Sequence, residues 1–473
     1  MHFGLIWVFI EKLGASLLSV AVFFVYAKFL TTAEMGVAVM ILSITQFLAG
    51  LISAFFEDVL VQKKELDERD LDTSFWVGIF VSLGVMAATA LGFWFWAKES
   101  GSHIFPLAMF ASLEILATNV MTTYVAQLRR SGHFKILAFR VLLGRIGGSL
   151  LGLVCIFANL GPWSIIVQSV TGILLQCVIL VAAVRSVPGF DICLPLLRKN
   201  LSFGSLIASQ RLLWDLLVRV TPLSAGIVGG ASMAGVVGFA WRIVELPRSA
   251  ISSGLYSYLL PLLSRYQHNQ QEMAVQFVKI TGIISFFVTP LFLGLYEVTP
   301  YLITGIFGQK WVDTIPLIQL FTLAALFSSY RIPAYIALNA SGHPGKTLIL
   351  DIVSIALTIL IMFVFGSVGA WVMGAAHLFR FFVSLPKGIS LIKSVLGLSV
   401  SQQFMPMLKY AIPGLVMFDV LVLLRYFAPY FDLNYSAGIM MGADICLGFL
   451  VFSVLSYFFF REDLRTWKAG MKS

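Results

Sequence analysis

The sequence predicts an all-α, polytopic membrane protein of about fourteen transmembrane helices. Of its 473 residues, 59% are hydrophobic, only 12% are charged, and 41 are phenylalanine. A typical soluble domain has about 25% charged residues. Apolar runs recur along the whole chain, and each approaches the roughly 20 residues that a helix needs to cross a bilayer. We therefore expect membrane-spanning helices, whose backbone hydrogen bonds are all satisfied internally.

The apolar runs place the expected spans between short connections, which leaves no room for an extramembrane domain. The run from Leu13 to Ala27 is not followed by a small-residue cleavage site, so it reads as a retained first helix and not as a signal peptide. In chain order, we expect spans at residues 5–29, 34–58, 74–97, 104–128, 135–158, 163–184, 203–227, 233–259, 277–297, 313–338, 347–367, 370–392, 406–428 and 436–460.

The net charge of +9 would suggest a nucleic-acid partner in a soluble protein. Here the basic residues concentrate in the connections on one side of the expected membrane, as in cytoplasmic loops. This asymmetry predicts that both termini are cytoplasmic, with the lipid bilayer and not nucleic acid as the surrounding partner. The four cysteines have no ligand spacing, and no catalytic constellation is recognisable, so we expect no metal, no cofactor and no catalytic residue.

An internal repeat divides the chain. Ser131-Gly132-His133, followed by an apolar run and Gly161-Pro162-Trp163, recurs roughly 210 residues later as Ser341-Gly342-His343 and Gly369-Ala370-Trp371. Because six spans is an even number, the two halves would have the same orientation and be related by a pseudo-two-fold axis along the membrane normal. Transporters with such repeats move one lobe against the other around a central site.

The repeat sets the expected domain boundaries. We expect an N-terminal six-helix lobe over residues 1–190 (spans one to six) and a C-terminal six-helix lobe over residues 200–395 (spans seven to twelve). A helix pair over residues 406–460 (spans thirteen and fourteen) follows them. A weaker sequence similarity, between Met35-Gly36 and Ala234-Gly235, aligns the second span with the eighth.

Charges within the span at 233–259 are the first sign of a functional site. Arg242, Glu245 and Arg248 share one face at about 100° per residue. An arginine near the centre of a membrane helix costs roughly 2.5–3.5 kcal/mol, and such residues normally face a bundle interior or a water-filled cavity. One interpretation is an anion-binding face; the alternative is that Arg242 only pairs with Glu245 and fixes helix packing.

Further arginines extend the pattern through the spans. They outnumber the acidic residues at comparable depth, which favours an anionic ligand over internal ion pairs, and the planar guanidinium suits phosphate best. The candidate substrate-binding residues are Arg140, Arg145, Arg211, Arg219, Arg242, Arg248 and Arg380.

Four acidic residues in the spans are candidates for ion coupling or for charge pairing: Asp215, Glu245, Asp419 and Asp444. Asp215 lies four residues from both Arg211 and Arg219, on one helix face. Asp419 and Asp444 fall at similar depth in the last two spans. We expect Arg425, nearer the surface, to pair with one of them.

Several motifs carry a resemblance to a known family: Leu30–Gly36, Asp72–Trp76, Gly161–Ser164, Gly235–Pro247 and Gly308–Trp311. Their order over most of spans one to twelve resembles the polysaccharide-transporter (Wzx-like) branch of the multidrug/oligosaccharidyl-lipid/polysaccharide exporter superfamily. The resemblance implies an inner-membrane flippase that moves polyprenyl-pyrophosphate-linked oligosaccharide repeat units from the cytoplasmic to the outer leaflet for exopolysaccharide, capsule or O-antigen synthesis. The polymerase and chain-length machinery of that synthesis would be further partners.

Two other functions remain open from the residues. A multidrug exporter of the same superfamily would need an acidic or apolar cavity for its cations, whereas the spans here are rich in arginine. A membrane-embedded polysaccharide polymerase or ligase usually carries catalytic residues on a sizeable outer loop, and the expected outer loops are short.

Overall fold

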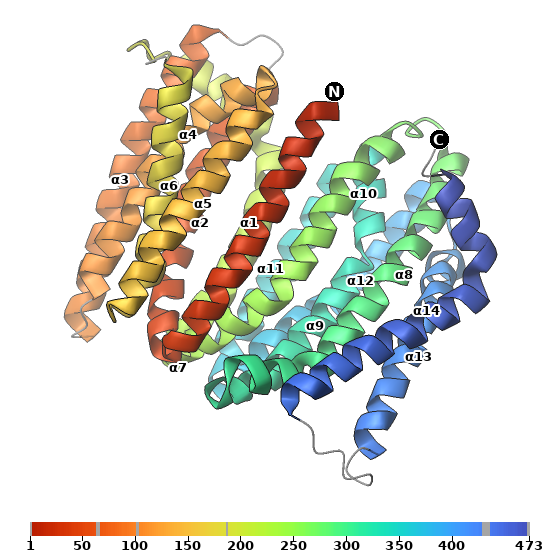
Figure 1. The fold of residues 1–473 in the computed structure, drawn as a ribbon. Helices are drawn as coiled ribbons and strands as arrows, with labels where there is room; N and C mark the ends of the chain where they lie inside the picture. Colours follow the sequence, from red (N-terminus) through yellow and green to blue (C-terminus); the bar gives the residue numbers. More distant parts are fainter. Residues whose placement is uncertain (1, 63–66, 101–103, 186–187, 428–435, 471–473) are drawn as a thin grey trace. The chain divides into compact units, whose positions relative to one another are not determined.

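A computed structural model describes residues 2–62, 67–100, 104–185, 188–427 and 436–470, and no strand occurs among them (Figure 1). The chain divides into two compact units. Unit 1 comprises Met1–Gly238 and Met362–Ser367, and unit 2 comprises Phe239–Ile361 and Val368–Ser473. The prediction of an all-helical fold is therefore confirmed.

Unit 1 contains the first six helices and the beginning of a seventh. These are α1 (His2–Phe29), α2 (Thr32–Gln62), α3 (Glu68–Ser100), α4 (Ile104–Arg130), α5 (Phe134–Phe157), α6 (Trp163–Val184) and the first part of α7 (Leu194–Ser264). A core of buried side chains packs α2, α3, α4 and α6 together, with Ile41, Phe93, Ala111 and Val170 among its members.

Helices α5 and α6 pack through their backbones because glycines line the contact. A methyl group added at Gly148 would overlap the Gln168 carbonyl oxygen and lie 2.9 Å from the backbone nitrogen of Gly172, and one at Gly144 would lie 2.6 Å from the Gly172 carbonyl oxygen. Without a hydrophobic driving force between helices in lipid, such close van der Waals contact is what holds membrane helices together.

Helix α7 combines two of the expected spans, and the break between them is at Gly230. This residue has φ +79° and ψ 179°, a conformation that is open almost only to glycine. This kink separates two helices within α7, which correspond to the spans expected at 203–227 and 233–259. The segment after Gly230 returns along α2, and the Ser232 and Thr32 hydroxyls are 2.9 Å apart.

Unit 2 contains the remaining helices. These are the end of α7, then α8 (Gln270–Leu302), η1 (Ile303–Phe307), η2 (Gln309–Thr314), α9 (Ile315–Ser329), α10 (Ile332–Ala340), most of α11 (Pro344–Phe365), η3 (Gly366–Val368), α12 (Trp371–Leu396), α13 (Val400–Phe427) and α14 (Ala437–Gly470). Helix α8 packs against α9 and α13, and α9 packs against α12. The fully buried Trp311 stacks on Phe239 with ring centroids 3.9 Å apart.

The repeated Ser-Gly-His motif forms the same turn at both positions. Gly132 and Gly342 have φ of +74° and +76°. The His133 amide donates to the Leu128 carbonyl at 3.0 Å, and the His343 amide donates to the Leu338 carbonyl at 3.0 Å. This is the Schellman arrangement that ends a helix at a left-handed glycine. The sequence repeat therefore corresponds to a repeated local structure, while the lobe boundaries stay a prediction.

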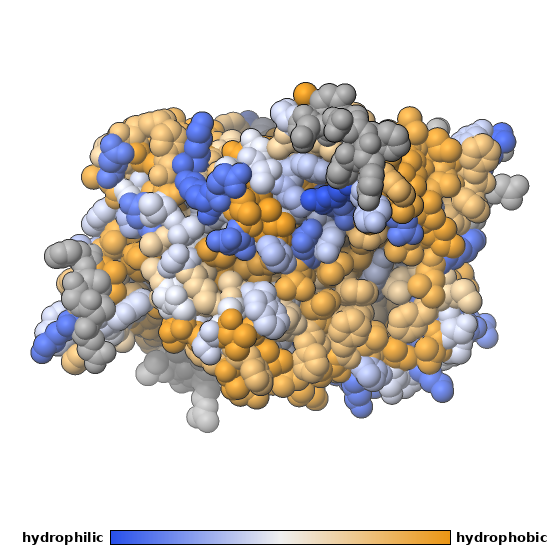
Figure 2. All heavy atoms as spheres, turned by 90° about the horizontal axis from the view of Figure 1, so that it is seen from below, coloured by the Kyte–Doolittle hydropathy of each residue, from blue (hydrophilic) through white to orange (hydrophobic). Residues whose placement is uncertain are grey.

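Helix length and composition identify a multi-span membrane protein. Eleven helices of the described chain are long and apolar enough to cross a membrane, with Leu212–Ser264 of α7 counted once. Fourteen crossings and cytoplasmic termini therefore stay predictions. The face drawn in Figure 2 is largely apolar, with hydrophilic residues in separate patches. Phe449 and Phe458 on α14 are 73% and 77% exposed, which suits side chains that face lipid.

Candidate functional site

The predicted arginines fall in both units. Arg140 and Arg145 lie on α5, and Arg219 lies on the first part of α7, all in unit 1; Arg242 and Arg248 on the second part of α7 and Arg380 on α12 lie in unit 2. The side chain of Arg211 lies outside the described residues. The structure therefore presents two separate sets of membrane-embedded arginines, one in each unit.

In unit 1, Arg219 is held by Asp215 on its own helix and by Gln46 on α2. Its Nε lies 3.4 Å from Asp215 Oδ1, one helical turn earlier. Its Nη1 donates to Gln46 Oε1 on α2, and the Gln46 amide donates to Ser169 Oγ on α6 at 3.0 Å. The guanidinium thus connects α7 with α2 and α6, and it retains donors for a ligand because a guanidinium has five N–H groups.

The arginines on α5 have neutral hydrogen-bond partners. Arg145 Nη1 donates to Ser19 Oγ on α1 at 2.6 Å, and Arg140 Nη1 lies 3.7 Å from the Met121 sulfur on α4. The nearby acid Glu57 is instead 2.6 Å from Arg129 Nη1. Glu57 and Glu11 lie within electrostatic range of Arg140, and Glu11 also lies within range of Arg145. The hydrogen-bond partners of these arginines are therefore neutral, while acidic side chains nearby balance part of their charge.

In unit 2, Glu245 and Arg248 form a bidentate ion pair. Arg248 Nε donates to Glu245 Oε2 at 2.6 Å, and Arg248 Nη2 donates to Glu245 Oε1 at 2.5 Å. The two side chains are only 21% and 12% exposed. The sequence left open whether Arg242 pairs with Glu245; the structure shows the bidentate pair with Arg248, and Arg242 is exposed.

Four basic side chains form a cluster around α12, which we name the α12 basic cluster: Arg248, Arg331, His377 and Arg380. His377 and Arg380 are buried, with 4% and 7% exposure. Arg380 lies within electrostatic range of Arg331, Asp351 and Arg248, and His377 within range of Arg380 and Arg248. The Trp241 ring contacts the His377 ring at 4.6 Å between centroids, so it belongs to the core around the cluster.

Acidic neighbours balance this cluster only in part. Tyr335 donates to Asp351 Oδ2 at 2.5 Å, and Arg331 Nη2 lies 4.0 Å from Asp351 Oδ1. With Glu245 bound to Arg248, three guanidinium groups face two carboxylates, and the excess is positive. The sequence analysis did not select Arg331 as a site residue, although the span expected at 313–338 contains it. Arg331 directly precedes α10, whose first turn contains Pro333.

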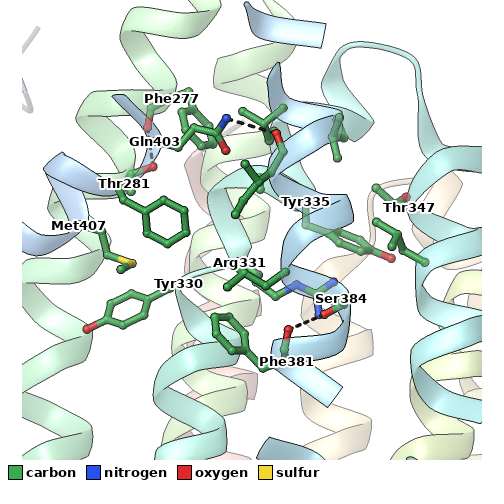
Figure 3. A pocket seen from close by; sticks show the side chains of 18 residues that line it. Phe277, Thr281, Tyr330, Arg331, Tyr335, Thr347, Phe381, Ser384, Gln403 and Met407 are labelled. Carbon is green, nitrogen blue, oxygen red and sulfur yellow. Dashed lines mark hydrogen bonds between the residues drawn. The ribbon is translucent and has the colours of Figure 1, made fainter. Parts of the chain in front are cut away.

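A pocket of about 740 Å³, including its open mouth, adjoins the cluster in unit 2. Its lining comes from α8, α10, α11, α12 and α13 and includes Arg331, Tyr335 and Ser384. Figure 3 shows Tyr335 and Thr347 on the side opposite Thr281 and Met407, with Arg331 between them. Aromatic and aliphatic side chains complete the walls, so the pocket suits an amphiphile with an anionic group.

A charge pair that the sequence did not predict joins α13 to α8. Arg425 on α13 lies 3.4 Å from Glu297 Oε2 on α8, and its guanidinium is 5.1 Å from the centre of the Tyr301 ring. The sequence offered Asp419 and Asp444 as partners. Asp419 is exposed, and Asp444 is half-buried within electrostatic range of Arg425. Periodicity along one helix could not reveal Glu297, because the contact joins helices distant in sequence.

The fold and the charges within its helices define a polytopic, all-helical membrane protein. The chain belongs to the family described as "Polysaccharide biosynthesis protein", whose model matches residues 25–316. The resemblance inferred from the motifs is thereby confirmed.

Curated relatives support this membership. The teichuronic acid biosynthesis protein TuaB of Bacillus subtilis is 23% identical over 95% of this chain and 94% of its own length. The lipopolysaccharide biosynthesis protein WzxC of Escherichia coli is 22% identical over 60% of this chain and 59% of its own length. The succinoglycan biosynthesis transport protein ExoT of Rhizobium meliloti is 21% identical over 67% of this chain and 65% of its own length.

Solved structures share the fold. The lipid II flippase MurJ, in an inward closed conformation, superposes with a TM-score of 0.73 at 16% identity, covering 98% of this chain and 100% of that one. An inward-facing multidrug-resistance transporter of the MATE family gives a TM-score of 0.61 at 16% identity, covering 82% of this chain and 96% of that one.

Proposed function

We propose that this protein is an inner-membrane flippase for polyprenyl-pyrophosphate-linked oligosaccharide repeat units. It moves them from the cytoplasmic to the outer leaflet, where they serve exopolysaccharide, capsule or O-antigen synthesis. Family membership, the biosynthetic names of the relatives and the fold shared with a lipid flippase support this proposal. Polymerase and chain-length machinery act on the product after it reaches the outer leaflet.

The observation that carries the proposal is the excess of guanidinium groups over carboxylates around α12 among the described residues, where Arg380 is buried and Arg248 and Arg331 are half-buried. Membrane proteins bury arginines where they serve a substrate pathway or a partner, and here three of them face two carboxylates around α12. Guanidinium groups bind phosphate oxygens in a bidentate manner. In this proposal Arg140, Arg145, Arg211, Arg219, Arg242, Arg248 and Arg380 bind the pyrophosphate or acidic sugars during translocation.

The mechanism in this proposal is alternating access through a basic central cavity. The headgroup enters from the cytoplasm, the prenyl tail remains in lipid, and the two six-helix lobes move against each other to release the sugar outward. The repeated turns at Gly132 and Gly342 support two equivalent halves, and internal repeats are common in transporters that work by rocking.

The test is deletion of the gene followed by analysis of lipid-linked saccharides. A complete repeat unit should accumulate on the inner leaflet and polymer export should stop. Accumulation on the outer leaflet would instead indicate a polymerase or ligase, and unchanged saccharides would indicate a drug exporter. Complementation with Arg380→Ala should fail at normal abundance, whereas the exposed Arg265→Ala should restore export.

A further inference from the structure

A buried carboxylate in unit 1 has no role in the proposed headgroup site. Glu114 on α4 is 0% exposed. It lies ten residues after the start of the helix, about 15 Å along it at 1.5 Å per residue, and so falls well inside the apolar span. Gln46 on α2, Ser169 on α6 and Arg219 on α7 are its polar neighbours.

The hydrogen bonds of these neighbours are directed to one another. Gln46 donates to Ser169 and accepts from Arg219, and Arg219 also lies against Asp215. Ser169 and Gln46 are near enough to interact with Glu114, but within the part of the chain that is described neither of its carboxylate oxygens meets the distance and angle of a hydrogen bond. An ionised carboxylate in a dry site needs such partners, whereas the neutral acid does not carry the same desolvation cost.

The proton on Glu114 decides the net charge of the cluster that Glu114 forms with Arg219 and Asp215. Arg219 and Asp215 neutralise each other, so the cluster is neutral when Glu114 carries a proton and has a charge of −1 when it does not. Helix α2 contributes Gln46 and α6 contributes Ser169, both uncharged, and α3 has no charged residue between Thr73 and Ala97. On α5, Arg140 contacts Met121, seven residues farther along α4, or about 10 Å away.

We infer that Glu114 is a proton-binding site whose occupancy controls how strongly Arg219 binds an anionic headgroup. The proton comes from water and is held on one carboxylate oxygen as an O–H group. Its arrival removes the negative charge that competes with the ligand for the Arg219 guanidinium. By linkage, a proton that strengthens anion binding is itself bound more tightly when the anion is present. The role of Arg219 as a ligand rests on the proposed function.

Infrared spectroscopy tests the proton site without any transport. The full chain in detergent should show the carbonyl band of a protonated carboxyl group that disappears as the pH rises, and Glu114→Gln should lack this band. Glu114→Asp should keep a titrating band. Glu68→Gln, an exposed carboxylate at the start of α3, is the matched control and should keep the wild-type band. An unchanged band in Glu114→Gln would overturn the inference.

Binding of a defined probe tests the coupling. The probe is a short-chain prenyl-pyrophosphate-linked N-acetylglucosamine, in which both phosphates are esterified and do not titrate near neutral pH. Its affinity for the wild-type protein should fall about tenfold, within the usual range of coupling between sites, as the band disappears. Glu114→Gln should bind tightly at every pH, while Glu68→Gln should follow the wild type.

The two experiments separate two kinds of failure. A wild-type affinity that does not change with pH while the Glu114 band titrates would overturn the coupling. The absence of probe binding at every pH would count against Arg219 as a headgroup ligand and thus against this part of the proposed function, and the infrared result would still decide whether Glu114 binds a proton.

Discussion

The backbone of Gly36 on α2 lies directly against the backbone of Gly235 on α7. A methyl group at Gly36 would overlap the Ala231 carbonyl oxygen and lie 2.8 Å from the amide nitrogen of Gly235; one at Gly235 would overlap the Thr32 carbonyl oxygen and lie 3.1 Å from the amide nitrogen of Gly36. Gly36 and Gly235 are also aligned with each other by the weaker internal sequence similarity. Equivalent residues that contact each other are expected at the axis of a two-fold repeat.

We expect Gly36→Ala to destabilise the protein. The added methyl group cannot fit without moving backbone, and overpacking of this kind costs typically about 1–3 kcal/mol. Thermal inactivation in detergent and abundance in the membrane measure the effect. Gly92→Ala is the matched control on α3, because nothing lies within 4 Å of the added carbon there. Equal stability of the two variants would show that the contact between the glycines is not tight.

A disulfide between α2 and α7 should stop export if these helices separate during the cycle. The hydroxyls of Thr32 and Ser232 are 2.9 Å apart, so Thr32→Cys with Ser232→Cys places the sulfurs close enough to bond. Oxidation should abolish polymer export, and reduction should restore it, while each single variant should export under both conditions. Full export by quantitatively cross-linked protein would contradict the rocking of the two lobes.

The hydrophobic pattern was sufficient to predict the fold class because a membrane leaves few alternatives to apolar helices. It placed two expected spans on either side of Gly230, but it did not identify this glycine, whose φ of +79° forms the kink between the two helices of α7. The pattern also did not reveal that one expected span contains two helices: α9 ends at Ser329, and α10 begins at Ile332.

The candidate site was predictable only along single helices. Helical periodicity placed Arg242, Glu245 and Arg248 on one face, but it could not choose between two possible partners of Glu245. The choice depends on rotamers, and the structure gives Arg248. Contacts between helices, such as Arg331 with Asp351, follow from tertiary packing that no spacing within one span encodes.

Removal of Arg425 should destabilise unit 2 through Glu297. Glu297 is 5% exposed, and its partner Arg425 lies at 3.4 Å, so Arg425→Ala leaves a buried charge without compensation. We expect a loss of about 2 kcal/mol, since an unsatisfied buried group costs about 1–3 kcal/mol and more when charged. Arg425→Ala combined with Glu297→Gln should recover most of the thermal stability. No recovery would mean that the contact of Arg425 with the Tyr301 ring dominates.

The final prediction separates binding from packing among the charges of α7. Arg248→Ala should lower the abundance of the protein because Glu245 loses its bidentate partner, and adding Glu245→Ala should restore part of it, since a lone buried charge costs more than none. Export should stay absent in the double variant if Arg248 also binds the headgroup. Recovery of both abundance and export would leave only a structural ion pair.

Arg242 completes this comparison because it is exposed, whereas Arg248 is the bidentate partner of Glu245. Arg242→Ala should keep normal abundance and lose export, and Arg242→Lys should retain part of the export, since lysine keeps the charge but not the bidentate geometry. Adding Glu245→Ala to Arg242→Ala should not restore export. Restoration of export would show that Arg242 acts through Glu245 and not on the substrate. Measuring polymer export together with the abundance of the protein in the membrane distinguishes these two roles of Arg242.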